Sequence, residues 1–189
     1  MRTLILSSLL ALGLAASVSA QQPLSPIVTD PTAQDAAISF GGPEPVRFVT
    51  ATGDEHVIMA EIAATPEQQQ RGLMWRDSIE PGTGMLFQYV PAEPASMWMR
   101  NTLVDLDILY VNEAGRIVKI IAYAQAESRR SLSAEATVSG VIELGAGQSI
   151  AMGLRPGDRV YHPFFPEEAV ADVTEPDVDA AQEAPVEAQ

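Results

Sequence analysis

The stretch PASMWMRNTLVDLDILYVNEAGRIVKI, residues 94–120, decides the fold of this chain. Its second half predicts a β-hairpin, with strands over residues 107–111 and 116–123 joined by the turn NEAG, in which Gly115 takes the left-handed position. Its first half places two methionines around a tryptophan and then adds a cluster of polar side chains. Polar residues just before a strand favour a tight turn, and this turn is a candidate functional surface.

Further short strands are predicted on both sides of this stretch. They cover residues 46–50, 56–63, 85–90, 96–99, 137–144 and 159–162. One short helix is predicted over residues 66–74, because Thr65 suits the N-cap, Pro66 the first helical position and Gln68 the capping box. About seven or eight short strands with one short helix predict a mainly β fold, either an antiparallel sandwich or a partly closed barrel.

The two ends of the chain differ in composition from its middle. Residues 1–20 have a basic start, a short apolar run and a small-residue cleavage pattern, which predicts a signal peptide. Residues 21–45 are rich in proline and predict a disordered linker, whereas residues 166–189 are acidic without a basic residue and predict a disordered tail. A single β domain is therefore expected over residues 46–165, in an exported protein that is periplasmic or secreted.

The composition excludes several kinds of chemistry. The chain has no cysteine, which excludes disulfides, a cysteine nucleophile and thiolate metal sites. Its formal net charge of −14 disfavours nucleic acid as a partner. After the predicted signal peptide, no apolar run is long enough to span a bilayer. We expect a monomer without a cofactor, whose partner is a small molecule or a component of the cell envelope.

Five motifs follow one another along the middle of the chain. They are RGLM at residues 71–74, GMLF at 84–87, WMRNT at 98–102, LDILYV at 106–111 and GDRV at 157–160. In this order they resemble domain-of-unknown-function family 192, a group of small and often exported prokaryotic proteins. The resemblance implies a mainly β, sandwich-like fold and no established activity. The family usually has a proline where this chain has Asp105, so the turn before the hairpin carries an additional charge here.

A ligand site is expected where the RGLM helix meets the turn that bears the tryptophan. The candidate residues are Arg71, Arg76, Trp98, Arg100, Asn101 and Asp107. In the favoured interpretation, these residues are structural: Asn101 and Asp107 hold the corner, and Arg71 or Arg76 forms an ion pair with Asp107. In the alternative, they form a small polar pocket, in which an arginine binds an anionic group and Trp98 is an apolar wall.

A copper site is a second alternative. Met97 and Met99 share one face of the predicted strand, so their soft thioethers could bind copper(I) together. His56 or His162 could supply a nitrogen ligand. Methionine is also an ordinary residue of hydrophobic cores, and we expect no metal.

A hydrolase is a third alternative. Asp105 and Asp107 could act as acid and base, with Glu143 on a facing strand. Glu143 lies in the apolar run VIEL, where it either faces inward toward an arginine or faces solvent. Because no catalytic motif accompanies these carboxylates, we expect a binding or accessory module rather than an enzyme.

Overall fold

The computed structural model describes residues 30–166. The predicted signal peptide and almost all of the predicted acidic tail lie outside these residues. The described part has seven strands and two short helices. Along the chain they are β1 (Gly41–Val49), β2 (Glu55–Ala63), α1 (Pro66–Arg71), β3 (Thr83–Met97), β4 (Leu106–Val111), β5 (Ile117–Ala124), β6 (Leu132–Gly145), α2 (Gln148–Ala151) and β7 (Arg159–Tyr161).

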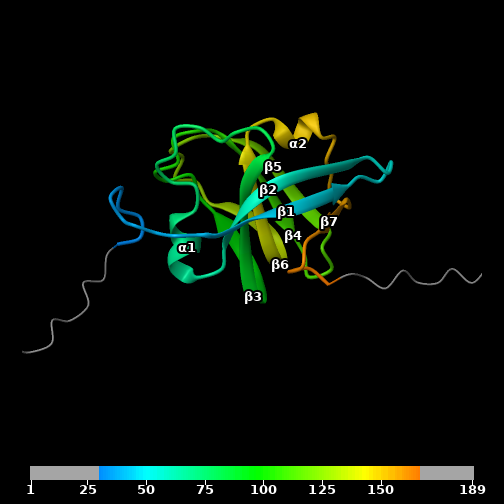
Figure 1. Cartoon of the computed structure of the whole chain (residues 1–189), viewed down its shortest axis with the longest axis horizontal. Coiled ribbons are helices and arrows are strands. Elements are labelled where there is room, and N and C mark those ends of the chain that lie inside the picture. Colours follow the sequence, from blue (N-terminus) through cyan, green and yellow to red (C-terminus); the bar gives the residue numbers. More distant parts are fainter. Residues whose placement is uncertain (1–29, 167–189) are drawn as a thin grey trace, which may run out of the picture.

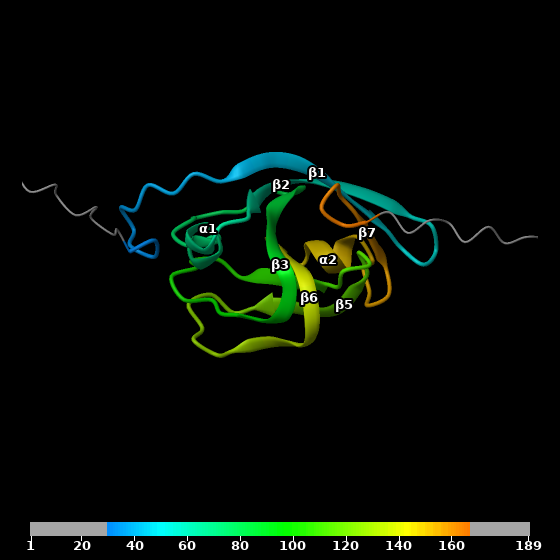
Figure 2. The same cartoon turned by 90° about the horizontal axis from the view of Figure 1, so that it is seen from below.

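All seven strands form one sheet, in the order β5-β4-β6-β3-β2-β1-β7. The sheet curls into a half-barrel, with α1 beside it and α2 near one end (Figures 1 and 2). The predicted mainly β fold is therefore confirmed, and a second short helix accompanies the predicted one.

Local sequence signals account for several elements. The hairpin of β4 and β5 forms as predicted, and Gly115 in its turn has a φ of 71°. Thr65 caps α1, because its side chain accepts a hydrogen bond from the backbone N–H of Gln68, whose own side chain completes the capping box. The helix ends at Arg71 rather than at the expected Met74, because Gly72 leaves the helical conformation with a φ of 47°.

One strand pair differs from the antiparallel expectation. Strands β2 and β3 run parallel, from the pair Met59 and Thr83 to the pair Ala63 and Phe87. A parallel pair needs a crossover connection, and residues 64–82, which include α1, provide it. The crossover places α1 and the loop after it against one face of the sheet.

The central strands are buried on both faces, so the sheet has two hydrophobic clusters. The first cluster includes Phe48, Leu86, Leu109, Ile142 and Leu144. The second includes Leu73, Met85, Phe87, Ile108, Tyr110 and Val141. Because successive residues of a strand face opposite sides, each central strand contributes alternate residues to the two clusters. The loop after α1 contributes Leu73, so this loop covers the face of the second cluster.

The chain before β1 lies beside α1 (Figure 1). Residues 21–29 of the predicted linker lie outside the described residues, and its last residues, from Gly41 onward, belong to β1 and pair with β2. Ahead of that strand, backbone carbonyl groups of Pro31, Ala33 and Gln34 accept hydrogen bonds from the Arg71 guanidinium. These contacts fix residues 30–40, which we call the N-terminal arm, and they explain why this segment has a defined position.

Candidate functional site

A buried glutamate on β6 is the most unusual polar residue of the structure. Glu143 lies opposite Met85 of β3 and Ile108 of β4, and it faces the second hydrophobic cluster. The residue is 4% exposed. Within residues 30–166, its side chain has no hydrogen-bond or ion-pair partner. Buried polar groups are nearly always hydrogen-bonded, so an unpartnered buried carboxyl group indicates a site with a special role.

Burial determines the charge of this carboxyl group. Loss of hydration disfavours the ionised form and raises the pKa of Glu143 to about 8, although the nearby charge of Arg76 opposes the increase. Glu143 is therefore mostly protonated at pH 7. A protonated carboxyl group has one O–H donor and a carbonyl acceptor, and both are available to a bound molecule.

A small pocket of about 100 Å³ opens above Glu143. Its walls come from α1 and the loop that follows, from β3, and from the tryptophan-bearing turn: Gln69, Gln70, Arg71, Gly72, Leu73, Met74, Phe87, Tyr89, Ser96, Met97, Trp98 and Thr102. Three of the motifs quoted above, RGLM, GMLF and WMRNT, thus contribute to one pocket around a glutamate on a fourth segment. We call it the Glu143 pocket.

Gly72 of the RGLM motif brings the backbone close to the carboxyl group. A Cβ atom at this position would lie 3.8 Å from Glu143 Oε2 and 3.1 Å from Phe87 Cζ. Its φ of 47° is also a conformation that residues with a side chain rarely adopt. A glycine here therefore keeps the space over Glu143 open.

Two of the predicted site residues, Arg71 and Trp98, line the Glu143 pocket. Arg71 donates to Pro31 O over 3.2 Å and to Gln34 O over 3.3 Å, besides its bond to Ala33 O. Trp98 is 44% exposed and forms part of the rim. Arg71, at the end of the helix, and Trp98, in the turn, therefore line the same pocket.

Three other predicted residues lie near the pocket but not on its walls. Arg76 pairs with Glu61 of β2 over 2.5 Å. The guanidinium of Arg100 stacks on Trp98, 5.6 Å from the ring centre. Asn101 has a φ of 59°, and its backbone carbonyl group accepts a hydrogen bond from the Trp75 N–H over 2.8 Å, so it shapes the turn.

The expected ion pair between Asp107 and an arginine is wrong. Asp107 is fully buried and accepts hydrogen bonds from the backbone N–H of Tyr123 and from both the N–H and the hydroxyl group of Ser149. On β4 it pairs with Leu144, on the face of the first cluster. Arg71 and Arg76 belong to the segment that covers the opposite face. Strand alternation therefore separates the carboxylate from both candidate arginines.

Asp105 and Asp107 do not share a cleft in the described structure. Asp105 is exposed, and one of its carboxylate oxygens accepts a hydrogen bond from the Ala126 N–H over 2.7 Å. Asp107 has no exposed surface. Each carboxylate accepts hydrogen bonds from backbone groups of neighbouring segments, an arrangement typical of structural aspartates.

The proposed copper ligands lie apart. Met97 and Met99 are both buried in the second cluster, and Met97 accepts a hydrogen bond from the Tyr89 hydroxyl group over 3.6 Å. His56 is on β2, just before the point where β3 begins alongside it, while Met97 is at the far end of β3. His162 contacts Glu44 over 3.0 Å. Among residues 30–166, no group of three histidine or carboxylate side chains is placed to hold a metal ion.

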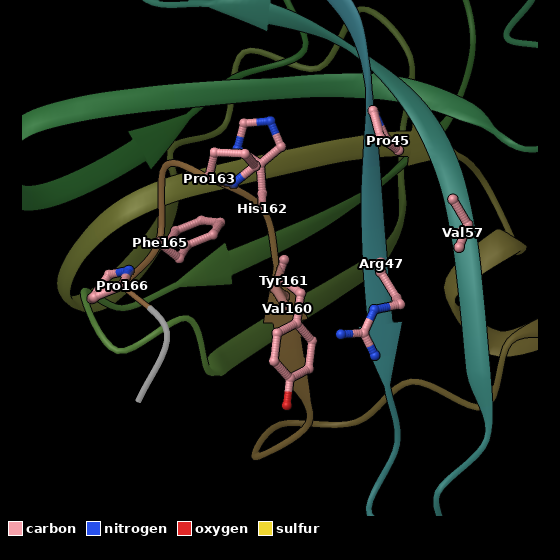
Figure 3. A pocket seen from close by; sticks show the side chains of 9 residues that line it. All are labelled: Pro45, Arg47, Val57, Val160, Tyr161, His162, Pro163, Phe165 and Pro166. Atoms are coloured by element: carbon pink, nitrogen blue, oxygen red, sulfur yellow. The ribbon is translucent and has the colours of Figure 1, made fainter. Parts of the chain in front are cut away.

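A wider hollow of about 630 Å³ lies between β1 and the segment after β7 (Figure 3). Its basic side chains already have partners, because Arg47 pairs with Glu55 over 3.1 Å and stacks 4.1 Å from the Tyr161 ring centre, while His162 contacts Glu44. Its wall also includes Pro166, the last described residue. The Glu143 pocket is smaller, but it contains a polar group without a partner, and we regard it as the candidate site for this reason.

The fold and the pocket define a small, mainly β domain built around a buried carboxyl group. The chain belongs to the family DUF192, described as an uncharacterized ACR, whose model matches residues 48–162. This confirms the resemblance drawn from the sequence motifs. No curated protein matches the chain.

Two solved structures are similar to the chain. One is a putative transcription regulator from Sinorhizobium meliloti 1021, with 36% sequence identity and a TM-score of 0.64, covering 67% of this chain and 97% of its own. The other is a protein of unknown function from Novosphingobium aromaticivorans DSM 12444, with 32% identity and a TM-score of 0.62, covering 71% of this chain and 97% of its own. Both are similar over almost their full length.

Proposed function

We propose that this protein is an exported binding module that holds a small molecule, or a terminal group of an envelope component, in the Glu143 pocket. The observation that carries the proposal is the buried carboxyl group without a partner at the base of an accessible pocket. This carboxyl group has no hydrogen-bond partner in the described part of the chain and lines the pocket. A bound molecule that supplies a partner there would gain a hydrogen bond, which contributes about 0.5 to 1.5 kcal/mol.

The size of the pocket limits what it holds. An apolar protein cavity of about 150 Å³ accommodates benzene. A pocket of about 100 Å³ therefore suits a group of a few non-hydrogen atoms. A larger ligand would insert one end and leave the rest near the exposed ring of Trp98 at the rim.

Export is supported by the sequence of residues 1–20, which has the features of a signal peptide. In residues 30–166, both helices are too short to cross a membrane. One structural neighbour is named a putative transcription regulator, but the sequence pI of about 4.3 of this chain disfavours binding to a phosphate backbone. We therefore propose a ligand that is not a nucleic acid.

A fragment screen by protein NMR tests the proposal. We expect fragments of a few non-hydrogen atoms to shift backbone signals of residues 69–74 and 96–98 together. Trp98→Ala should weaken such binding by about tenfold, because the ring closes one side of the pocket.

Leu103→Ala is the matched control, because Leu103 is 38% exposed on the same turn and does not line the pocket. It should leave the affinity unchanged. The proposal would be overturned if no fragment bound, or if the shifts clustered at the hollow of Figure 3 instead.

A further inference from the structure

We propose that the group bound in the Glu143 pocket is a carboxylate, held by a hydrogen bond from the Glu143 side chain and attracted by the arginines around the pocket. This inference rests on the proposed binding function and adds the chemical class of the ligand. It follows from the charges that surround the pocket and from the position of the carboxyl group at its base.

Positive charge surrounds the pocket although the whole chain carries a formal net charge of −14. Arg71 lines the pocket, and its three hydrogen-bond partners are backbone carbonyl groups, which leave its charge uncompensated. Arg100 lies over the Trp98 ring at the rim and forms no ion pair with any residue between 30 and 166. Its charge acts at longer range on Asp30 of the N-terminal arm.

Other ionisable groups near Glu143 are a paired glutamate, two tyrosines and Glu93, whose charge acts on Tyr89. On β2, Glu61 is paired with Arg76 over 2.5 Å. On β3 and β4, burial raises the pKa of the Tyr89 and Tyr110 hydroxyl groups, so both are neutral at physiological pH. Besides Glu143, the one charged side chain among the residues that line the pocket is Arg71, so the charge nearest to a ligand at neutral pH is positive and favours an anion over a cation.

The protonated state of Glu143 also favours an anionic ligand. A protonated carboxyl group donates a hydrogen bond to a carboxylate oxygen, and such charge-assisted bonds are short and strong. An ionised Glu143 would repel the same ligand. Thr102, which is 5% exposed and lines the pocket, adds a hydroxyl group that can also donate. The pocket thus combines two neutral donors with nearby guanidinium groups.

The arrangement links ligand binding to the protonation of Glu143. The pKa of the free carboxyl group is raised to about 8 by burial, and a bound carboxylate would raise it further. Only the protonated form binds. Affinity should therefore be constant well below pH 8 and should fall about tenfold for each pH unit above it.

Three probes matched in size test the ligand class: propionate, propionamide and n-butylamine. Binding is followed by NMR at pH 6.5 and pH 9.5, through the backbone signals of residues 69–74 and 96–98. We expect propionate to bind more tightly than the other two at pH 6.5, and to weaken by more than about tenfold at pH 9.5.

Two arginine variants test whether propionate is attracted by the arginine at the rim of the pocket or by the overall charge of the protein. Arg100→Gln should weaken propionate binding by about fivefold, because it removes a charge at the rim. Arg155→Gln removes an exposed arginine outside the pocket and should leave the affinity unchanged. Both side chains are at least partly exposed, so neither variant is expected to disturb folding.

Tighter binding of propionamide or n-butylamine in the Glu143 pocket would overturn the carboxylate inference and leave the proposed binding function standing. Propionate binding that is equal at both pH values, or equally weakened by the two arginine variants, would also overturn it. Failure of all three probes would overturn it as well, and the fragment screen would then decide the proposed function separately.

Discussion

Replacing Asp107 by alanine is expected to lower the free energy of unfolding by about 3 to 5 kcal/mol. The carboxylate accepts three hydrogen bonds, at 2.9 Å from Tyr123 N, at 2.9 Å from Ser149 N and at 2.7 Å from the Ser149 hydroxyl group. Ser149 is 1% exposed, so water cannot easily replace the lost acceptor at either of its groups. The variant therefore leaves buried donors unsatisfied where α2 and β5 meet β4.

Chemical denaturation at neutral pH measures this effect, with Asp105→Ala as the matched control. Asp105 accepts a single hydrogen bond from Ala126 N and is exposed, so its removal should cost only about 1 kcal/mol. If the two variants lost equal stability, Asp107 would not have the structural role assigned to it here.

Replacing Glu143 by glutamine is expected to stabilise the protein increasingly as the pH rises. The pKa of Glu143 is raised from 4.5 to about 8 by burial, so the folded state binds this proton more tightly than the unfolded state. The stability that depends on the bound proton is complete below pH 4.5 and is lost progressively as the pH rises through 8. A glutamine keeps the shape of the protonated side chain and does not titrate.

The expected difference in unfolding free energy between Glu143→Gln and the original protein is near zero at pH 4. It should rise to about 3 kcal/mol in favour of the variant at pH 7 and level off near 5 kcal/mol above pH 8. Denaturation of both proteins across this pH range gives the difference directly, since other titrating groups contribute equally to both.

Glu135→Gln provides a control with the opposite sign. Glu135 is exposed, and a hydrogen bond from Lys119 lowers the pKa of its carboxyl group. Its stabilising contribution is present at neutral pH and lost as the pH falls. The glutamine variant at this position should therefore become slightly less stable than the original protein as the pH rises from acid to neutral. A parallel response of the two variants would contradict the burial of Glu143.

Local sequence patterns predicted the elements that depend on residues close together in the sequence. The capping box at Thr65 and the hairpin around Gly115 formed as expected, because a few neighbouring residues determine each of them. The direction of the β2 and β3 pair was missed, because it depends on how α1 and the following loop pack against the sheet. The predicted strand 85–90 and the first two residues of the predicted strand 96–99 belong to the single strand β3, which continues past Pro91 with an irregular register and ends at Met97.

The sequence indicated two of the segments that line the candidate site, but not the contacts of its carboxyl groups. The RGLM segment was expected to meet the turn around Trp98, and both line the Glu143 pocket. An ion pair between these arginines and Asp107 was expected wrongly, because sequence alone does not tell which face of β4 the helix covers. For Glu143, the signal was an acid within the apolar run VIEL, and only the strand register placed it at the base of the pocket.

The most direct test of the central claim is the titration of the Glu143 carboxyl carbon by NMR, with its signal assigned through its absence in Glu143→Gln. A buried carboxyl group without a protein partner should titrate with a midpoint near pH 8. A midpoint near 4.5, the ordinary value for a glutamate, would show that this side chain is hydrated or paired and would contradict the account of the pocket.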